Sequence, residues 1–420
     1  MSKARTIYLA KRALTHKNRS RGEVEAIVKR QMEEVKDLVT EIDPRTNFHL
    51  DTTKIAFHKE RIEAWRRGEH VAPITIDMAL TQKCSYACTF CYAGLQQLDS
   101  APVKWDTYEF FLDDCKSIGH KPGHGVKAIS LVSDGESTEN PDYYRFIKYA
   151  KFLGIDTASG TNGFKLKKEE LPELVDNLTY LRFNFDAANP KTYAEIMGTS
   201  EKSFFTVVEN IKECVRLKKE RGSNVTIGLQ MVLLPEYADQ VIPLALLGKS
   251  LGVDYTVFKH CSDDEKGRLG VDYAWYTSQI ATDLLRTAEG LSTPTYSVQA
   301  KWSKMRTGRE RKYSKCFGTP LLLQMSGTGI VAPCGSFFHE RYKRYHIGDI
   351  KTTRFKDIWA SSEYKEVTSF LASDRFDARR MCATLCLQDK VNESLNDMME
   401  NGIELPDVTG LPEPMHKNFI

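Results

Sequence analysis

The sequence lacks a long hydrophobic run, an export signal and an excess of charge of either sign. Its longest apolar run, Val241–Leu247, is far shorter than the roughly 18 residues that a membrane-spanning helix requires. Residues 1–20 contain no apolar core followed by a cleavage site, so we expect a cytoplasmic protein. The net charge of +3 gives no reason to expect nucleic acid or a membrane surface as a partner.

The chain does have an ordinary globular composition and ten cysteines. Apolar residues make up 41% and charged residues 27% of its 420 residues, which is typical of folded globular proteins. The length exceeds that of a usual single domain, so we expect one large core with appendages. Without an export signal the cysteines should be reduced, and a dense local group of them then indicates metal ligation or catalysis rather than disulfides.

Seven of the ten cysteines fall into two groups. Three of them lie within eight residues with the spacing CxxxCxxC: Cys84, Cys88 and Cys91. Four more lie near the end of the chain: Cys316, Cys334, Cys382 and Cys386. Buried structural thiols would be scattered over apolar faces. That explains Cys115 and Cys214, which lie on apolar stripes of expected helices, but it does not explain the groups.

Between the two groups the hydrophobic pattern alternates between strand and helix. The expected strands cover 74–80, 126–132, 155–159, 178–185, 225–234 and 253–260. The helices between them cover 107–118, 143–152, 168–176, 204–219 and 238–251. Such alternation predicts a parallel sheet with helices outside, closed or partly closed as a barrel. We therefore predict the α/β class, with a partial (β/α)6 parallel barrel.

The predicted organisation has five parts. Residues 1–72 form an N-terminal helical extension, with apolar stripes over 23–40 and 53–67, and residues 73–262 form the barrel. Residues 263–312 are linker helices, 313–395 a small α+β domain that contains the second cysteine group, and 396–420 a C-terminal tail that we expect on the surface.

The first cysteine group directly follows the first expected strand. In parallel α/β barrels active sites gather at the C-terminal ends of the strands, and thiolates are the usual ligands of [4Fe-4S] clusters. Three thiolates would leave one iron open to a small molecule. The CxxxCxxC spacing, with Phe90 before the last cysteine, resembles the signature of the radical S-adenosylmethionine (SAM) enzymes. Zinc is the alternative, but it needs a fourth ligand and usually closer spacings.

Further segments of the barrel are similar to motifs of that family. Ser133–Ser137 resembles its Gly-Gly-Glu-Pro element, although Asp134 and Ser137 depart from it, and an ordinary turn is the alternative. Thr161–Gly163 matches Thr-Asn-Gly, and the segment 181–198 resembles the Ser-x-Asp…Tyr…Gly segment with Asn in place of Ser. The resemblance implies SAM contacts from Tyr92, Gly135, Glu136, Thr161, Asn184, Asp186 and Gln230.

For Asn184, Asp186 and Gln230, strand alternation alone predicts only that the side chain points into the barrel. Asn184 and Asp186 alternate with Phe183 and Phe185, so both should point into the barrel. Gln230 is placed similarly on the fifth strand. Each would serve equally well as a plain polar residue of the barrel interior.

The resemblance also implies the chemistry. SAM would chelate the open iron through its amino and carboxylate groups, and a reductant such as flavodoxin or ferredoxin would supply one electron. The resulting 5′-deoxyadenosyl radical would abstract a hydrogen atom from the substrate. The cofactor performs the difficult step, and the protein selects the hydrogen and excludes water.

The second cysteine group resembles the SPASM and twitch extensions of radical SAM enzymes. Cys316, Gly329 and Cys334 have the spacing of their opening, and the segments 347–350 and 355–359 are similar to their linking part. The resemblance implies that Cys382 and Cys386 complete the site. Four cysteines fit the shorter twitch form with one auxiliary [4Fe-4S] cluster, and zinc is again the alternative.

The sixth strand ends in Lys259-His260-Cys261, at the expected catalytic rim. Lys259 and Cys261 would share one face of the strand. By resemblance to radical SAM epimerases, the Cys261 thiol would donate a hydrogen atom to a substrate radical, whereas a bystander thiol is the alternative. Lys259 could instead orient an anionic substrate.

We therefore expect a radical SAM enzyme that oxidises or epimerises a small polar biosynthetic intermediate. A maturase of a ribosomally made peptide is the second hypothesis, although such enzymes often have a winged-helix domain with three strands and residues 1–72 have a helical pattern. A hypothesis from another class is a non-catalytic, zinc-stabilised binding scaffold. The sequence does not identify the substrate.

Overall fold

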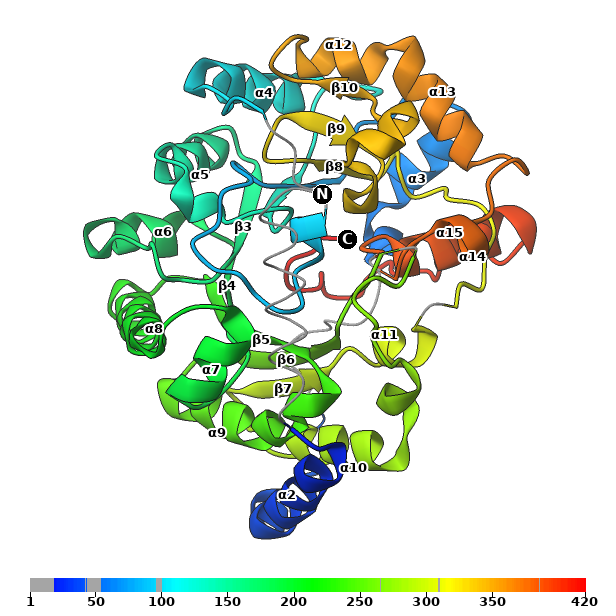
Figure 1. The fold of residues 1–420 in the computed structure, drawn as a ribbon. Coiled ribbons are helices and arrows are strands. Elements are labelled where there is room, and N and C mark those ends of the chain that lie inside the picture. Colours follow the sequence, from blue (N-terminus) through cyan, green and yellow to red (C-terminus); the bar gives the residue numbers. More distant parts are fainter. Residues whose placement is uncertain are drawn as a thin grey trace.

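The computed structural model describes residues 19–41, 43, 54–95, 100–264, 266–308, 310–384 and 386–420. Its centre is a ten-stranded sheet that curves into an open barrel, with helices around it (Figure 1). The strands follow the order β10-β9-β8-β1-β2-β3-β4-β5-β6-β7. No helix in the described part of the chain is both long enough and apolar enough to cross a membrane.

The six predicted strands are all present. They are β1 Thr75–Met78, β2 Ala128–Leu131, β3 Asp156–Thr161, β4 Tyr180–Asn184, β5 Thr226–Leu233 and β6 Tyr255–His260. Each is parallel to the next. Their carboxyl ends therefore meet at one rim of the barrel, and this rim positions the loops of the site.

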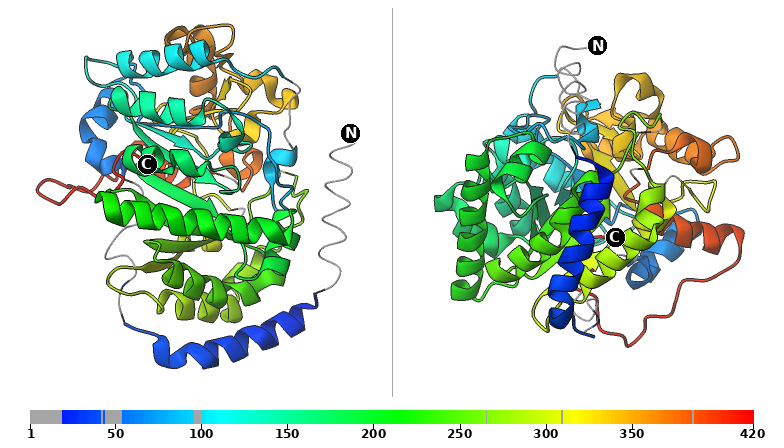
Figure 2. Two further views of the ribbon diagram at one scale, coloured as in Figure 1. Left: turned by 90° about the vertical axis from the view of Figure 1, so that its left-hand side faces the viewer. Right: turned by 60° about the horizontal axis from the view of Figure 1, so that its bottom comes forward.

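Helices cover the outside of the barrel (Figure 2). The outer helices are α4 Trp105–Ser117, α5 Tyr143–Phe152, α6 Leu171–Asn177, α7 Pro190–Met197, α8 Glu201–Arg221 and α9 Val241–Leu251. Their apolar residues recur at helical spacing, as in α5, which buries Tyr143, Phe146, Ile147 and Ala150. α7 begins with Asn189 as its N-cap and a proline in its first turn, and ends at the left-handed Gly198.

The sheet extends beyond the six predicted strands on both sides. β7 Ser297–Ala300 is parallel to β6, and β8 Leu322–Met325 is parallel to β1. β7 lies in the region 263–312, where the pattern predicted only linker helices. That region also holds α10 Gln279–Glu289 and α11 Trp302–Thr307. The four residues of β7, SVQA, are too few and too polar to give a strand pattern.

The cysteine-rich C-terminal region is joined to the barrel through backbone hydrogen bonds. β8 continues the parallel sheet, and β9 Ile330–Ala332 and β10 Gly348–Asp349 add antiparallel strands to it. The helices of this region are α12 Phe355–Ala360, α13 Ser362–Leu371, α14 Ala378–Met381 and α15 Asp389–Glu400. The small α+β domain is therefore a direct extension of the barrel wall.

In the described residues before β1, the regular elements are helices, and the rest of the predicted N-terminal extension lies outside the described ranges. α2 Arg21–Val35 packs its buried face on α10 and on the turn before α9, and α3 Lys59–Arg66 lies beside the barrel. The buried Arg61 of α3 donates hydrogen bonds to the carbonyls of Ala72, Pro73, His124 and Gly125 at 2.8–3.0 Å. Short 3-10 helices occupy 36–38, 55–58, 92–95, 137–139, 168–170, 235–240, 274–277, 335–337 and 340–345.

The C-terminal tail has an exposed part and a part that packs against the barrel. Residues 403–413 are largely exposed and Met415 is 48% exposed, whereas residues 416–420 are half-buried under the N-terminal ends of the strands, and the C label lies near the barrel centre in Figure 1. The Thr75 hydroxyl of β1 donates to the Asn418 carbonyl at 2.7 Å, and the Asn418 amide donates to Asp156 of β3 at 2.7 Å. The Thr226 hydroxyl of β5 is 2.8 Å from the His416 ring. The tail thus closes the end of the barrel opposite the catalytic rim.

Candidate active site

The loop with three cysteines leaves β1 at the carboxyl rim and rests on the end of α7. The Ala87 and Thr89 N–H groups donate to the carbonyls of Gly198 and Ile196 at 3.4 and 2.9 Å. A Cβ atom on Gly198 would lie 2.1 Å from the Ala87 oxygen, so only glycine allows this contact. The Tyr193 hydroxyl also donates to the Tyr86 hydroxyl at 3.4 Å. The predicted Tyr…Gly segment therefore supports the cysteine loop.

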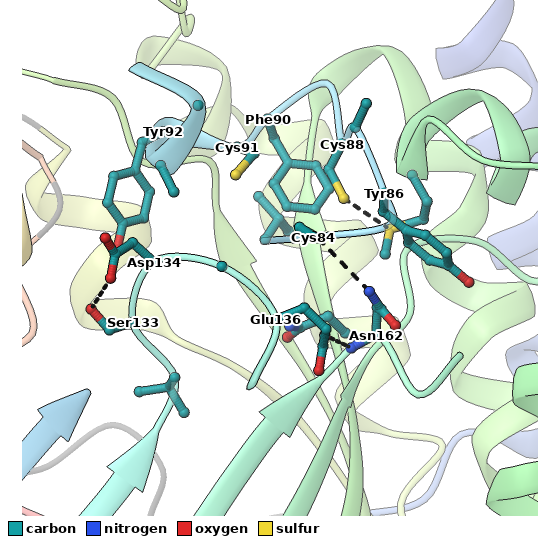
Figure 3. A pocket seen from close by; sticks show the side chains of 18 of the residues that line it. Cys84, Tyr86, Cys88, Phe90, Cys91, Tyr92, Ser133, Asp134, Glu136 and Asn162 are labelled. Atoms are coloured by element: carbon teal, nitrogen blue, oxygen red, sulfur yellow. Dashed lines mark hydrogen bonds between the residues drawn. The ribbon is translucent and has the colours of Figure 1, made fainter. Parts of the chain in front are cut away.

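All three thiols of the loop line a cavity of about 480 Å³ at the rim, which we call the upper cavity (Figure 3). Burial raises the pKa of Cys84 to about 12 and raises the pKa values of Cys88 and Cys91 as well. The thiols are therefore protonated at neutral pH without a metal, and metal binding would release their protons.

The turn after β2 brings Gly135 and Glu136 to the same cavity. Gly135 has φ +100°, and a Cβ atom on it would lie 2.0 Å from the Thr81 carbonyl oxygen. The Glu136 carboxylate accepts hydrogen bonds from the Thr161 hydroxyl and the Asn162 N–H, both at 2.7 Å. Desolvation raises the pKa of Glu136. The carboxylate is thus held rigidly at the wall of the cavity.

Asn184 and Gln230 meet across β4 and β5. They are register partners, and the Gln230 side-chain amide donates to the Asn184 side-chain oxygen at 3.1 Å. Both line the upper cavity, as does Tyr92, which lies beside Asp134 in Figure 3. The structure therefore brings five of the predicted SAM contacts to one cavity: Tyr92, Gly135, Glu136, Asn184 and Gln230.

Two predicted SAM contacts, Thr161 and Asp186, are fully buried and lie outside the cavity wall. Thr161 acts through Glu136, to which it donates. One Asp186 oxygen accepts from the Val232 N–H at 2.5 Å, and the other has no hydrogen-bond partner among the described residues. Desolvation raises the pKa of Asp186 to about 8. Both side chains therefore support the wall from behind.

Lys259 and Cys261, both predicted at the catalytic rim, lie in different surroundings. Lys259 lines the upper cavity, and desolvation, with Arg182 and Lys301 nearby, lowers its pKa to about 7. Cys261 is fully buried in the apolar core, outside the wall of the cavity, and its thiol donates to the Ser262 carbonyl at 3.7 Å. The structure therefore brings Lys259, but not Cys261, to the cavity wall.

A second cavity of about 270 Å³, the inner cavity, lies deeper in the barrel. It shares Tyr92, Val132, Arg182, Gln230, Lys259 and Ser262 with the upper cavity. Towards the N-terminal ends of the strands it reaches Thr75 of β1 and the tail residues His416 and Phe419. The two cavities therefore adjoin, with these shared side chains at the boundary between them, and together they reach from the cysteine loop to the tail at the other end of the barrel.

Sequence reasoning missed Arg182 and undervalued Asn162, both of which line the upper cavity. Arg182 lies two residues before Asn184, so the alternation that selected Asn184 also places Arg182 on the inner face. The Asn162 side-chain amide lies 3.9 Å from the Cys84 sulfur. Within the Thr-Asn-Gly segment, Asn162 rather than Thr161 therefore faces the site.

Asp134, where the sequence departs from the Gly-Gly-Glu-Pro pattern, connects the barrel to the C-terminal domain. Its buried carboxylate accepts from the Ser326 hydroxyl at 2.7 Å and the Gly327 N–H at 2.9 Å, and also from the Gln82 side chain. Ser326 and Gly327 form the turn between β8 and β9. The departure from the motif thus has a structural reason that the sequence alone did not show.

The four C-terminal cysteines line one small cavity within their domain. Burial raises the pKa of Cys316 to about 11 and that of Cys334 to about 12. The Asn392 side-chain amide donates to the Cys316 sulfur at 3.5 Å, and the buried Arg311 places its charge near Cys382 and Cys386. An all-sulfur donor set with N–H donors and a cation beside it suits an iron-sulfur cluster.

The cysteines of each group line a cavity, but they do not converge on a single point as the ligands of a bound metal do. Within the described ranges no three Cys, His, Asp or Glu side chains already form a metal-binding group. The thiols nevertheless border a common cavity in each group. The sulfur donors therefore fit the clusters by their type and by their position around one cavity in each group.

Comparison with known proteins gives matches in the same two regions. The family model of the radical SAM superfamily matches residues 78–246, and that of the SPASM iron-sulfur cluster-binding domain matches residues 316–387. The S-adenosylmethionine-dependent nucleotide dehydratase of Selenomonas ruminantium is 24% identical over 180 residues, which span 42% of this chain and 62% of that protein.

Two further similarities cover more of the chain. The AdoMet-dependent heme synthase of Methanosarcina barkeri is 24% identical over 70% of this chain and 83% of its own length. The crystal structure of Streptococcus suis SuiB bound to the precursor peptide SuiA has a TM-score of 0.55 and 16% identity, over 79% of this chain and 75% of SuiB. At this identity the structural match shows the fold alone.

Proposed function

Because the chain belongs to the radical SAM superfamily and carries a SPASM iron-sulfur cluster-binding domain, we propose that it oxidises a small polar substrate by abstracting a hydrogen atom. Its cofactors are SAM and [4Fe-4S] clusters. The observation that carries the proposal is the pair of adjoining cavities that leads from the three-cysteine loop into the barrel, with Glu136, Asn184, Gln230 and Lys259 in their walls.

We assign the cysteines to two clusters. Cys84, Cys88 and Cys91 would hold the cluster that binds SAM, and Cys316, Cys334, Cys382 and Cys386 would hold the auxiliary cluster. When bound, the clusters and SAM supply the low-potential electron, the 5′-deoxyadenosyl radical and an acceptor for the electron that an oxidation releases. A small electron-transfer protein such as flavodoxin or ferredoxin would be the reductant.

The residues of the chain would then bind and orient. Glu136, held by Thr161 and Asn162, would accept hydrogen bonds from the SAM amino group, together with the backbone at Gly135. Asn184 and Gln230 offer an amide pair for the ribose or the carboxylate. The tail under the barrel and the loop on α7 would exclude water from the enclosed space.

Oxidation fits the site better than epimerisation. An epimerase that quenches the substrate radical needs a hydrogen-atom donor at the cavity. Among the described residues the only thiols at the two cavities are those of Cys84, Cys88 and Cys91, which the first cluster would occupy. The C-terminal domain also reaches the inner cavity through Leu387 and Asp389, next to Cys386.

A peptide maturase is the second candidate. The observation in its favour is the similarity in fold to SuiB, whose structure contains a bound precursor peptide. Against it, the described part of residues 19–72 contains helices and no strand. A peptide substrate would then have to insert a side chain or terminus into the barrel.

The test is anaerobic reconstitution with iron and sulfide, followed by measurement of reductant-dependent 5′-deoxyadenosine release. We expect release from the wild-type protein and none from the triple Cys84→Ala, Cys88→Ala, Cys91→Ala variant. The matched control is Cys214→Ala, a buried cysteine on α8, which should retain release. A colourless, zinc-loaded wild-type protein without release would refute the proposal and favour a scaffold.

A further inference from the structure

Two positively charged side chains lie where the upper and inner cavities adjoin. Arg182 on β4 and Lys259 on β6 line both cavities. The two positive charges lie close enough for Arg182 to lower the pKa of Lys259. Like charges gathered in a barrel interior are unfavourable unless an anion joins them.

The strands on either side of Arg182 leave room for its side chain. Its register partners are Gly160 on β3 and Gly228 on β5. A Cβ atom on Gly160 would lie 2.8 Å from an Arg182 guanidinium nitrogen, and one on Gly228 would lie 2.2 Å from the Tyr255 ring. A barrel interior built only for packing would be filled with branched apolar residues here. The sequence instead accommodates a guanidinium and a phenol.

Neither cation is neutralised by the described residues. No salt bridge among them includes Arg182 or Lys259, and the buried Nε of Arg182 has no hydrogen-bond partner there. The nearby carboxyls are Asp77 in the inner cavity and Asp186 behind the wall, and desolvation raises their pKa values to about 7 and about 8. These carboxyls are partly protonated near neutral pH, so they offset the positive charge only in part.

We propose that the substrate carries an anionic group, a carboxylate or a phosphate, that binds between Arg182 and Lys259. This inference rests on the proposed function and names the chemical class of its substrate. The planar guanidinium of Arg182 matches either anion with two parallel hydrogen bonds, and Lys259 adds a point charge. The inner cavity is also lined by Lys54, Lys301, Lys304 and Lys390, against the side-chain carboxyls of Asp77 and Asp389, so lysines outnumber carboxyl side chains in its wall.

The carboxylate of SAM is the competing anion, and position argues against it. Arg182 lies two residues before Asn184 on β4, which places it about 7 Å further from the carboxyl rim. The SAM contacts at Glu136, Asn162 and Asn184 belong to the upper cavity alone, whereas Arg182, like Gln230 and Tyr92, also lines the inner one. Arg182 is therefore placed to meet a group that reaches past SAM into the barrel, and Lys259 lies nearer the rim.

The test measures binding of three small probes to the reconstituted protein with saturating SAM, by calorimetry at constant ionic strength. The probes are glutarate, inorganic phosphate and the neutral glutaramide. We expect saturable binding of glutarate or phosphate and none of glutaramide, and the stronger anion identifies the substrate group as carboxylate or phosphate. Arg182→Gln and Lys259→Gln should each weaken anion binding about tenfold or more, because each removes a charge-assisted hydrogen bond.

Matched controls are Arg30→Gln and Lys148→Gln, whose side chains are 70% and 66% exposed and which should bind the anion as the wild type does. Equal binding of glutarate and glutaramide by the wild-type protein would overturn the inference, and this comparison needs no variant. So would site variants that bind the anion normally, or that lose affinity for SAM instead. Arg182→Lys and Lys259→Arg, which keep the charges, replace the glutamine variants if these do not fold.

The two proposals fail separately. Deoxyadenosine release without selective anion binding would overturn the anion site and leave the proposed function standing. Selective anion binding without release would support the site and refute the function.

Discussion

At the scale of single residues, the protonation of Lys259 should make anion binding in the barrel depend on pH. Desolvation, with Arg182 and Lys301 nearby, lowers its pKa to about 7, so the ammonium group is lost as the pH rises through neutrality. Over the same range Asp77 and Asp186 gain negative charge. All three changes disfavour an anion, so its affinity should fall as the pH rises from about 6 to about 8.

Lys259→Arg should flatten this pH dependence, because a guanidinium stays protonated throughout the range. The measurement is the dissociation constant of glutarate at several pH values in both proteins. A dependence that is identical in the variant would show that Lys259 does not contribute and would contradict its role.

Cys261 gives a second prediction at this scale. Because its thiol is fully buried away from the cavity, Cys261→Ala should retain reductant-dependent deoxyadenosine release and form the same substrate product. The expected cost is one of stability alone, about 1 kcal/mol, from the small volume lost in the core. Loss of product formation with intact deoxyadenosine release would restore Cys261 as a hydrogen donor.

Cys261 and Arg182 show how far strand alternation predicts a site. Alternation placed Cys261 beside Lys259, but β6 ends at His260, and beyond a strand end the two-residue period no longer applies. Within β4 the alternation does hold. Applied to the position two residues before Asn184, it would have identified Arg182 as a residue of the inner face. The contacts of Glu136 with Thr161 and Asn162 join two strands, so no local pattern could show them.

At the scale of elements, the contact between α7 and the cysteine loop makes a further prediction. Gly198→Ala places a methyl group against the Ala87 carbonyl, so it should displace the loop and lower the iron bound at the first site. Gly222→Ala is the matched control. Both glycines end a helix in the left-handed conformation, but nothing lies within 4 Å of a Cβ atom on Gly222.

Iron and sulfide analysis of the two reconstituted variants measures this effect. Gly198→Ala should retain the auxiliary cluster and lose much of the other, whereas Gly222→Ala should retain both at a similar small cost in stability from its positive φ. Equal iron in both variants would show that α7 does not support the loop.

The elements themselves were predicted where their patterns are strong. β5, with the sequence TIGLQMVL, carries the nearly continuous apolar run of a strand buried on both faces. β4, YLRFN, shows alternation instead, and helices such as α5 have clear apolar stripes. β7 was missed because its sequence, SVQA, carries no such signal and its place depends on pairing with β6. β8 lay in the segment predicted as a separate small α+β domain, and only its pairing with β1 makes it part of the barrel wall.

At the scale of the whole molecule, two long-range contacts define the enclosed space. Asp134 joins the rim of the barrel to the turn between β8 and β9, and residues 416–420 close the opposite end. Both connect segments nearly 200 residues or more apart, and neither follows from composition or periodicity. The motif spacings therefore predicted the cofactor sites, whereas the shape of the substrate space required the tertiary structure.

The central claim is that one chain carries two iron-sulfur clusters of different roles, and one measurement tests it most directly. The iron content of the anaerobically reconstituted protein is compared with that of two triple variants, Cys84/Cys88/Cys91→Ala and Cys316/Cys382/Cys386→Ala. The account predicts about eight irons in the wild type and about four in each variant, one cube being lost each time. A wild-type protein with about four irons, or a variant that keeps the full iron content, would contradict it.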